Sequence, residues 1–215
     1  MRYGIFSAQY LPNMGGVERY TYNLSKHLHM KGHEVYVITS NTKVLKWHEK
    51  MDEATVLRLS SFNFMNGRFP VPRLNRRFFL MLKEIEKLQL DFIIVNTRFY
   101  FLSLLGCWFA HKYNIPVVLI EHGTSHINFG NIFFNKIGEI YEHCITGMEK
   151  RYCHNYYGVS KSCNEWLLHY KIQAKGVFYN AIDLLDIEDN KKFVYPAVVR
   201  VPADEKFAGA EEVFN

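Results

Sequence analysis

The sequence lacks both a long apolar run and the cysteines that a disulfide scaffold would need. Its longest apolar stretch, residues 99–110, is interrupted by Ser103 and is shorter than the about 20 residues of a transmembrane helix. The N-terminus has no apolar core of signal-peptide length. The four cysteines form no C-x-x-C pair, so free thiols in a reducing compartment are the simplest interpretation. These absences predict a cytoplasmic protein.

The motifs of several common enzyme classes are missing as well. The sequence has no Ser-His-Asp order, P-loop lysine motif or zinc signature, so no residue stands out as a covalent nucleophile. The adjacent pair Gly15-Gly16 lacks the third glycine of the dinucleotide pattern G-x-G-x-x-G. No acidic residue occurs at 39–41, where a dinucleotide-binding enzyme would hold the ribose. A dinucleotide-dependent oxidoreductase is therefore disfavoured.

The first 185 residues alternate between strand and helix patterns. The expected strands are 3–7, 34–39, 55–59, 91–96, 116–121, 156–160 and 176–179. The expected helices run from Val17 to the stop at Gly32 and over 76–88, 99–113, 131–151 and 162–170. Continuous apolar strands such as FIIVN are typical of sheets covered on both faces. The pattern predicts an α/β fold, a Rossmann-like parallel sheet with helices on both faces.

The formal net charge of +5 is unevenly distributed along the chain. From Asp186 onward seven acidic residues stand against four basic ones, a net charge of −3, so residues 1–185 carry +8. A basic body favours anionic partners such as phosphates, acidic lipid surfaces or nucleic acid. No nucleic-acid-binding motif accompanies the charge, and we expect no nucleic-acid partner.

Ligands of open parallel sheets bind beyond the carboxyl ends of the strands, which makes the residues after each strand the candidates. These are Gly15 and Gly16, Thr97 and Arg98, His122 and Gly123, Ser160, and Asn180 to Asp183. The glycine pair precedes a helix whose N-terminal N–H groups and partial positive charge suit a phosphate. The alternative is that the two glycines only form a tight turn. This alternative is favoured, because short glycine motifs are weak evidence for a phosphate site.

His122 follows an expected buried strand. A histidine there can hydrogen-bond a substrate hydroxyl or phosphate, or act as a general base. His126 lies four residues on and raises the question of a two-histidine metal site, but Gly123 disfavours the helix that would align the pair, and no third ligand is evident. Cys153-His154 and His143-Cys144 also lack a recognised zinc spacing. We therefore expect no metal, and inert buried cysteines.

A basic cluster with interleaved phenylalanines lies between residues 68 and 79. It contains Arg68, Arg73, Arg76 and Arg77 together with Phe69, Phe78 and Phe79. Two interpretations carry similar weight. One is a solvated surface over core phenylalanines, and the other is contact with an anionic membrane or a phosphorylated lipid acceptor.

Several short motifs, taken in order, resemble the N-terminal half of family 4 glycosyltransferases over about residues 1–185. They are Tyr10-Leu11-Pro12, Gly15-Gly16-Val17-Glu18-Arg19-Tyr20, Gly32-His33-Glu34-Val35, Ile115-Pro116-Val117-Val118, Glu121-His122-Gly123, Tyr157-Gly158-Val159-Ser160 and Tyr179-Asn180-Ala181-Ile182-Asp183.

This resemblance implies one half of a GT-B architecture, in which two Rossmann-like domains face a cleft. The implied reaction is retaining hexosyl transfer from a UDP- or GDP-linked sugar to a glycan or lipid-linked acceptor, without a further cofactor or metal. The resemblance places Gly15 and Gly16 at the donor diphosphate, His122 at the transferred sugar, Thr97 and Arg98 at the acceptor, and Asn180 and Asp183 at the interdomain junction. The membrane interpretation of the basic cluster adds the expectation that this cytoplasmic protein is peripheral to the inner face of the membrane.

Residues 186–215 depart from the family pattern. They contain neither its Gly-Arg-Leu segment nor its Glu-x7-Glu motif, and Pro196 disfavours a central strand over 193–201. We therefore expect residues 1–185 to form the acceptor-side domain and residues 186–215 a divergent tail at the start of an absent donor domain, which a partner chain would supply. The alternatives are a non-catalytic acceptor- or membrane-binding module that works with a partner, and a degenerate product without activity.

Overall fold

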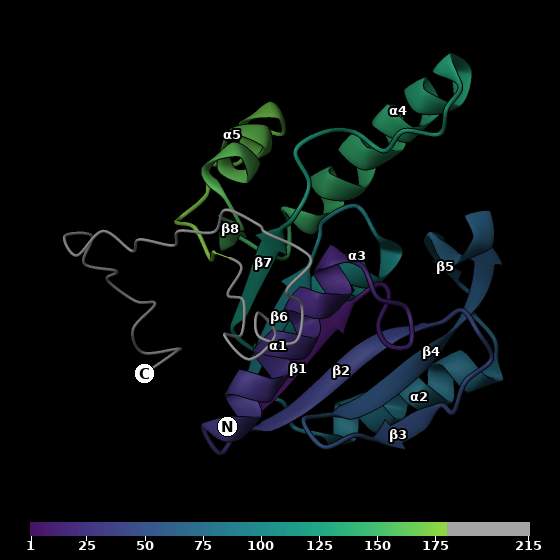
Figure 1. Cartoon of the computed structure of the whole chain (residues 1–215), viewed down its shortest axis with the longest axis vertical. Coiled ribbons are helices and arrows are strands. Elements are labelled where there is room, and N and C mark those ends of the chain that lie inside the picture. The colour runs from purple at the N-terminus through teal and green to yellow at the C-terminus, as the bar shows by residue number, and fades with distance from the viewer. Residues whose placement is uncertain (180–215) are drawn as a thin grey trace, which may run out of the picture. The chain divides into compact units, whose positions relative to one another are not determined.

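Two continuous apolar segments form neighbouring central strands of one mixed sheet, β6 (Phe92–Asn96) and β7 (Val117–Glu121). The computed structural model describes residues 1–179, apart from the side chain of Asn66 (Figure 1). The other strands are β1 (Arg2–Ser7), β2 (Glu34–Asn41), β3 (His48–Lys50), β4 (Thr55–Phe64), β5 (Phe69–Pro72) and β8 (Tyr156–Gly158). The sheet order is β3-β4-β2-β1-β6-β7-β8, and every neighbouring pair from β4 to β8 is parallel. The predicted α/β class and parallel sheet are confirmed.

Helices cover both faces of this sheet. They are α1 (Gly16–Met30), α2 (Arg76–Lys87), α3 (Phe101–Tyr113), α4 (Ile132–Glu149) and α5 (Lys161–His169). Alternate residues of β1 face opposite helices, because Ser7 meets Thr21 of α1 while Phe6 packs against Gly106 of α3. A Cβ at Gly106 would lie 2.8 Å from the Phe6 ring, so the glycine allows α3 to approach the sheet closely.

The main hydrophobic core lies on the α2 and α3 side of the sheet. It joins Phe6 and Ile38 to Ile85 and to the apolar face of α3. Local signals set the helix ends as expected. The Asn75 side chain accepts a hydrogen bond from the Phe78 N–H at the start of α2, and Gly32, with φ of +81°, follows the end of α1.

The structure differs from the expected elements mainly at the sheet edge. Two antiparallel strands, β3 and β5, flank β4, which is twice as long as the expected segment 55–59. Pro70 and Pro72 lie in the short edge strand β5, where a missing N–H is tolerated. The expected strand 176–179 is reduced to an isolated bridge between Val177 and Gly158. The tail expected at 186–215 lies outside the described residues. No helix among residues 1–179 has the length and hydropathy to cross a bilayer.

Candidate functional site

A pocket of about 260 Å³ lies at the carboxyl ends of the central strands, where the topology predicts a ligand. Strand ends and the start of α1 form its wall, which includes Ser7 at the end of β1, Gln9 after it, Val17 and Glu18 in α1, Thr97 and Tyr100 after β6, and His122 and His126 after β7. The sheet therefore brings together strand ends that lie more than 100 residues apart in the chain. A larger hollow at the opposite ends of β2 and β4 is lined by exposed turns and is remote from these candidates.

The two glycines at the start of α1 have different local surroundings. A Cβ at Gly15 would lie 2.5 Å from Glu18 Oε2, which accepts a hydrogen bond from the Gly15 N–H. A Cβ at Gly16 would meet no atom of residues 1–179 within 4 Å, and Gly16 has no positive φ. The position of the Glu18 carboxylate therefore explains why residue 15 is a glycine. Nothing in the described part of the chain requires a glycine at position 16. Residues 1–179 leave the space in front of Gly16, beside the helix N-terminus, open to an anionic ligand.

His122 is held at the pocket wall by two neighbours. Its Nε2 lies 3.3 Å from Asn96 Oδ1, and the Asn96 amide donates to Thr21 Oγ1 of α1 at 2.8 Å. The Tyr20 ring packs edge-on against the imidazole, with centroids 4.8 Å apart. Burial lowers the pKa of His122 to about 4, so the ring is neutral at physiological pH. With Nε2–H donating to Asn96, Nδ1 keeps a lone pair that can accept a hydrogen bond from a substrate hydroxyl.

Thr97 combines backbone strain with an unsatisfied hydroxyl. Its φ of +64° is unusual for a β-branched residue, and its carbonyl accepts a short 2.6 Å hydrogen bond from Ser103 Oγ. Among the described residues its buried Oγ1 has no hydrogen-bond partner, although Thr97 lines the pocket. Strained backbone and an unpaired polar atom are features that ligand sites retain. Thr97 therefore remains a candidate for ligand contact.

The predicted acceptor contact of Arg98 needs correction. The guanidinium is 0% exposed, so it cannot reach a ligand in the pocket. Its Nε lies 2.8 Å from Glu121 Oε2 and its Nη2 lies 3.1 Å from Glu142 Oε2, and both carboxylates are buried. The Tyr170 ring packs against the guanidinium at 3.6 Å. Arg98 is thus paired in the interior with two carboxylates that sequence reasoning did not select.

These two carboxylates hold the loop that carries His122. Glu121 Oε1 accepts a hydrogen bond from the Gly123 N–H, and Glu142 Oε1 accepts one from the Ile127 N–H, each at 2.7 Å. Arg98 lies between the two carboxylates and so links both ends of the loop 122–127. We assign Arg98 a positioning role. Glu121 and Asn96 could have been found from the sequence, because each is the polar last residue of an otherwise apolar strand. No such pattern distinguishes Glu142.

The four predicted basic residues lie together on the surface near the β4–β5 hairpin and the start of α2. Arg68, Arg73, Arg76 and Arg77 are all exposed. Arg73 lies over the Phe62 ring and Arg77 over the Trp47 ring. The Arg68 carbonyl accepts hydrogen bonds from the side chains of Gln9 and Tyr100, which line the pocket. Of the four, Arg68 therefore adjoins the pocket.

Two further expectations concern His126 and the junction. His126 does not pair with His122 but lies beside His143 and His169, from α4 and the end of α5. The expected junction residues Asn180 and Asp183 lie outside the described residues.

The sequence pattern of Glycosyltransferase Family 4 matches residues 14–185. The chain is 25% identical over 191 residues to an uncharacterized glycosyltransferase of Methanocaldococcus jannaschii, covering 86% of this chain and 48% of the relative. It is 32% identical over 122 residues to an alpha-monoglucosyldiacylglycerol synthase of Streptococcus pneumoniae, covering 57% and 26% of the two chains. The chain thus spans about half, or less, of the length of these relatives.

The fold is also similar to that of solved structures. Sucrose-phosphate synthase from Thermosynechococcus elongatus superposes with a TM-score of 0.52 at 16% identity, covering 83% of this chain and 46% of the synthase. At this identity the likeness concerns the fold alone.

Proposed function

Since the chain belongs to glycosyltransferase family 4, with the Rossmann-like fold of one half of a GT-B enzyme, we propose that it takes part in hexosyl transfer from a nucleotide-diphosphate sugar. The acceptor is a glycan or a lipid-linked hydroxyl, and the anomeric configuration is retained. The observation that carries this proposal is the convergence of the first turn of α1 (Val17 and Glu18, next to Gly16), Thr97 and neutral His122 on one pocket.

In the proposed reaction the bond from the sugar C1 to the diphosphate oxygen breaks, and a bond from C1 to the acceptor oxygen forms. Negative charge grows on the leaving diphosphate, which the N–H groups and partial positive charge at the start of α1 stabilise. The acceptor proton passes to the departing phosphate. His122 orients the sugar through its Nδ1 lone pair, because the ring is neutral at physiological pH and its single N–H is directed at Asn96.

The Glu18 carboxylate occupies the start of α1, where the donor diphosphate is proposed to bind. It accepts the Gly15 N–H at 2.9 Å, on the side of the helix where the diphosphate would lie. Binding of the diphosphate at Gly16 would therefore displace Glu18 from the Gly15 N–H, because two negative groups would otherwise adjoin. We propose that this domain supplies the acceptor wall and the glycine loop, and that a second Rossmann-like domain, in the same polypeptide or a partner chain, holds the nucleotide.

The direct test is calorimetric titration of the purified chain with UDP- and GDP-sugars. Gly16→Ala fills the open space, and Gly147→Ala is the matched control, since a Cβ at this α4 glycine also meets no atom within 4 Å. The expected result is saturable binding that weakens about 10- to 100-fold in Gly16→Ala, equivalent to one charge-assisted hydrogen bond of about 1.5–3 kcal/mol. His122→Ala should also weaken binding, with His154→Ala, an exposed histidine, as its control. Equal binding by Gly16→Ala and Gly147→Ala would contradict the proposed diphosphate site.

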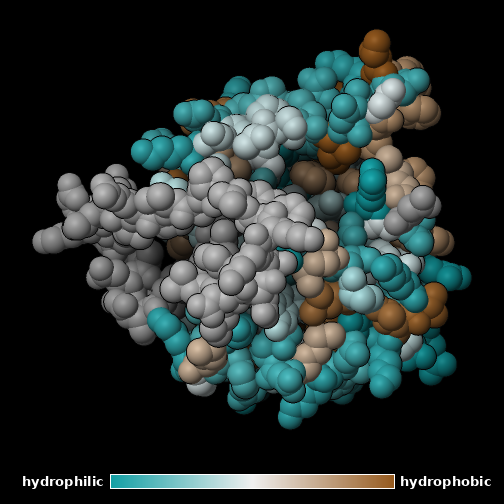
Figure 2. Space-filling view, viewed as in Figure 1, coloured by the Kyte–Doolittle hydropathy of each residue, from teal (hydrophilic) through white to brown (hydrophobic). Residues whose placement is uncertain are grey.

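A second proposal concerns the acceptor side. We propose that the arginine surface contacts an anionic membrane, since large apolar side chains are exposed among its cations. They are Phe62, Phe64, Met65, Leu74, Phe79 and Leu80. Figure 2 shows hydrophobic surface where β4, β5 and α2 meet, and again at the free end of α4. Exposed aromatic and basic residues together are typical of surfaces that lie in the headgroup region. The likeness to a relative named for a glucosylated diacylglycerol supports a lipid acceptor.

Co-sedimentation with vesicles of phosphatidylcholine and phosphatidylglycerol tests this contact. Each basic residue near an anionic surface contributes about 1 kcal/mol, so Arg73→Gln with Arg77→Gln should lower partitioning about 30-fold. Lys83→Gln with Lys87→Gln removes the same charge from the other half of α2 and should have a smaller effect. Binding that is equal on neutral vesicles, or insensitive to salt, would exclude the electrostatic contact.

A further inference from the structure

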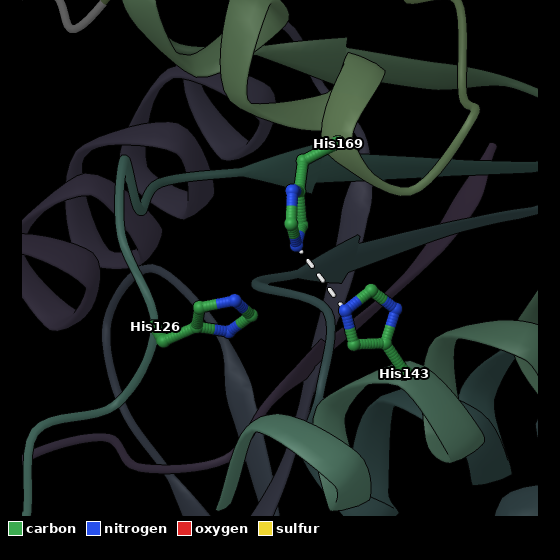
Figure 3. A group of neighbouring side chains, drawn as sticks. All are labelled: His126, His143 and His169. Carbon is green, nitrogen blue, oxygen red and sulfur yellow. Dashed lines mark hydrogen bonds between the residues drawn. The ribbon is translucent and has the colours of Figure 1, made fainter. Parts of the chain in front are cut away.

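Three histidines from separate segments form a cluster behind the pocket wall. His126 lies in the loop after β7, His143 lies on α4, and His169 is the last residue of α5 (Figure 3). One ring nitrogen of each lies within 4.8 Å of the others. The two Nε2 atoms of His143 and His169 are 3.2 Å apart. The sequence holds ten histidines, and three of them meet here although they are separated by 17 and 26 residues.

We propose that His126, His143 and His169 bind a divalent transition metal ion, with Zn²⁺ as the expected ion. Tetrahedral zinc bonds imidazole nitrogen at about 2.0–2.1 Å, which places neighbouring ligand atoms about 3.3 Å apart. The 3.2 Å separation of the His143 and His169 nitrogens already matches that spacing. His126 completes the set by a small rotation, since its ring is partly exposed and sits on a loop. Imidazole ligands suit zinc, copper and nickel rather than calcium or magnesium.

The surroundings of His126 fix the ring nitrogen that would face the metal. His126 Nδ1 lies 3.3 Å from Glu142 Oε2 and 3.1 Å from the Tyr170 hydroxyl, which itself donates to Glu142 Oε2 at 2.9 Å. With Nδ1–H directed at this carboxylate, the Nε2 lone pair is left for the ion. A carboxylate behind a ligating histidine is the usual second shell of zinc sites.

Aromatic residues hold the other two rings. The Trp166 ring stacks on His169 with centroids 4.9 Å apart and planes 4° from parallel, and Tyr170 packs against His143 at 4.8 Å. His126 also lines the pocket, so a bound ion would fasten the loop that carries His122 to α4 and α5.

The test is calorimetric titration of the untagged, metal-stripped chain with ZnCl₂ at neutral pH. The expected result is one ion per chain. His143→Ala and His169→Ala, both exposed and outside the core, should each weaken binding at least about 100-fold, because changes behind a ligand already cost 10- to 100-fold. Co²⁺ should give the intense visible absorption of a tetrahedral complex in the parent chain and lose it in these variants.

Two controls exclude other sources of zinc binding. Cys144→Ser removes the exposed thiol next to His143, and His154→Ala removes an exposed histidine outside the cluster. Both variants should bind zinc like the parent chain. The proposal is overturned if the parent chain binds no zinc, or if either cluster variant binds it as tightly as the parent. Neither readout depends on sugar binding, so it stands apart from the proposed function.

Discussion

Replacing Arg98 by Met should destabilise the protein strongly and loosen the pocket loop. The guanidinium is the cation that the structure places between the buried carboxylates of Glu121 and Glu142. A Met side chain fills similar space without charge. The variant would leave two buried carboxylates, each of which also accepts one N–H of the loop 122–127, without their shared counter-ion.

The size of the effect follows from the burial of the cluster. All three side chains are fully buried, so solvent screening does not reduce the interaction. Removing one partner of a buried ion pair costs about 3–5 kcal/mol. For a domain of this size, a loss of 1 kcal/mol in the free energy of unfolding lowers Tm by about 2–4 °C, so the expected fall in Tm is roughly 10 °C.

Urea unfolding followed by circular dichroism measures this change. Arg76→Met is the control, because Arg76 is exposed and a surface change of this kind is worth within about 0.5 kcal/mol. Arg98→Met combined with Glu121→Gln and Glu142→Gln should recover much of the lost stability, since buried ionic clusters can be replaced by neutral groups at little cost. A loss below about 1 kcal/mol in Arg98→Met, or no recovery in the combined variant, would refute the argument that paired charge holds the loop.

Three further predictions concern single groups. Burial raises the pKa of Glu149 well above its usual range, so the folded state keeps a proton that the unfolded chain releases. The free energy of unfolding therefore falls as the pH rises above about 4.5. Glu149→Gln should have a higher Tm than the parent chain at pH 8 and should lose this advantage near pH 5. Because the pKa of His122 is lowered to about 4, the unfolded chain takes up a proton at higher pH than the folded chain does. The free energy of unfolding should therefore drop by up to about 3 kcal/mol between pH 6.5 and 4. Urea titrations of His122→Asn should show a shallower drop than those of the parent chain. Thr97→Val removes the unpaired hydroxyl and should raise the free energy of unfolding by about 1 kcal/mol. The same variant should weaken sugar binding in calorimetry. Unchanged binding would show that Thr97 does not contact the ligand.

The central sheet could be predicted from the sequence because its strands are continuous apolar runs between recognisable turns. FIIVN and VVLIE needed no tertiary information to identify, and the glycine at 32 marked the end of a helix. The edge strands β3 and β5 could not be predicted in this way. HEK is polar and FPVP contains two prolines, and each is a strand only because β4 offers an antiparallel partner.

The same distinction applies to the candidate site: residues next to strand ends could be predicted from the sequence, and residues that meet only through tertiary packing could not. Gly16 and His122 could be selected as candidates because topology places the ends of parallel strands at one edge. Arg98 follows β6 in the same manner, yet it turns inward because Glu121 and Glu142 are buried within reach. Glu142 lies 44 residues away on a long helix, and only the packing of α4 brings it to Arg98. The histidine cluster was missed for the same reason, because its members share no sequence spacing.

The loop 122–127 shows why these buried charges bear on function. Thr124 and Ser125 are exposed, so apolar packing contributes little to holding this segment. Its position instead depends on two N–H groups donated to Glu121 and Glu142, and on the contact of His126 with Glu142. Because Glu142 accepts from Arg98, Tyr170 and Ile127 at once, a change at any of these groups alters the geometry around the others. The place of His122 at the pocket is therefore set by a polar network that extends into the histidine cluster, and an ion bound there would act on the pocket through Glu142 and His126.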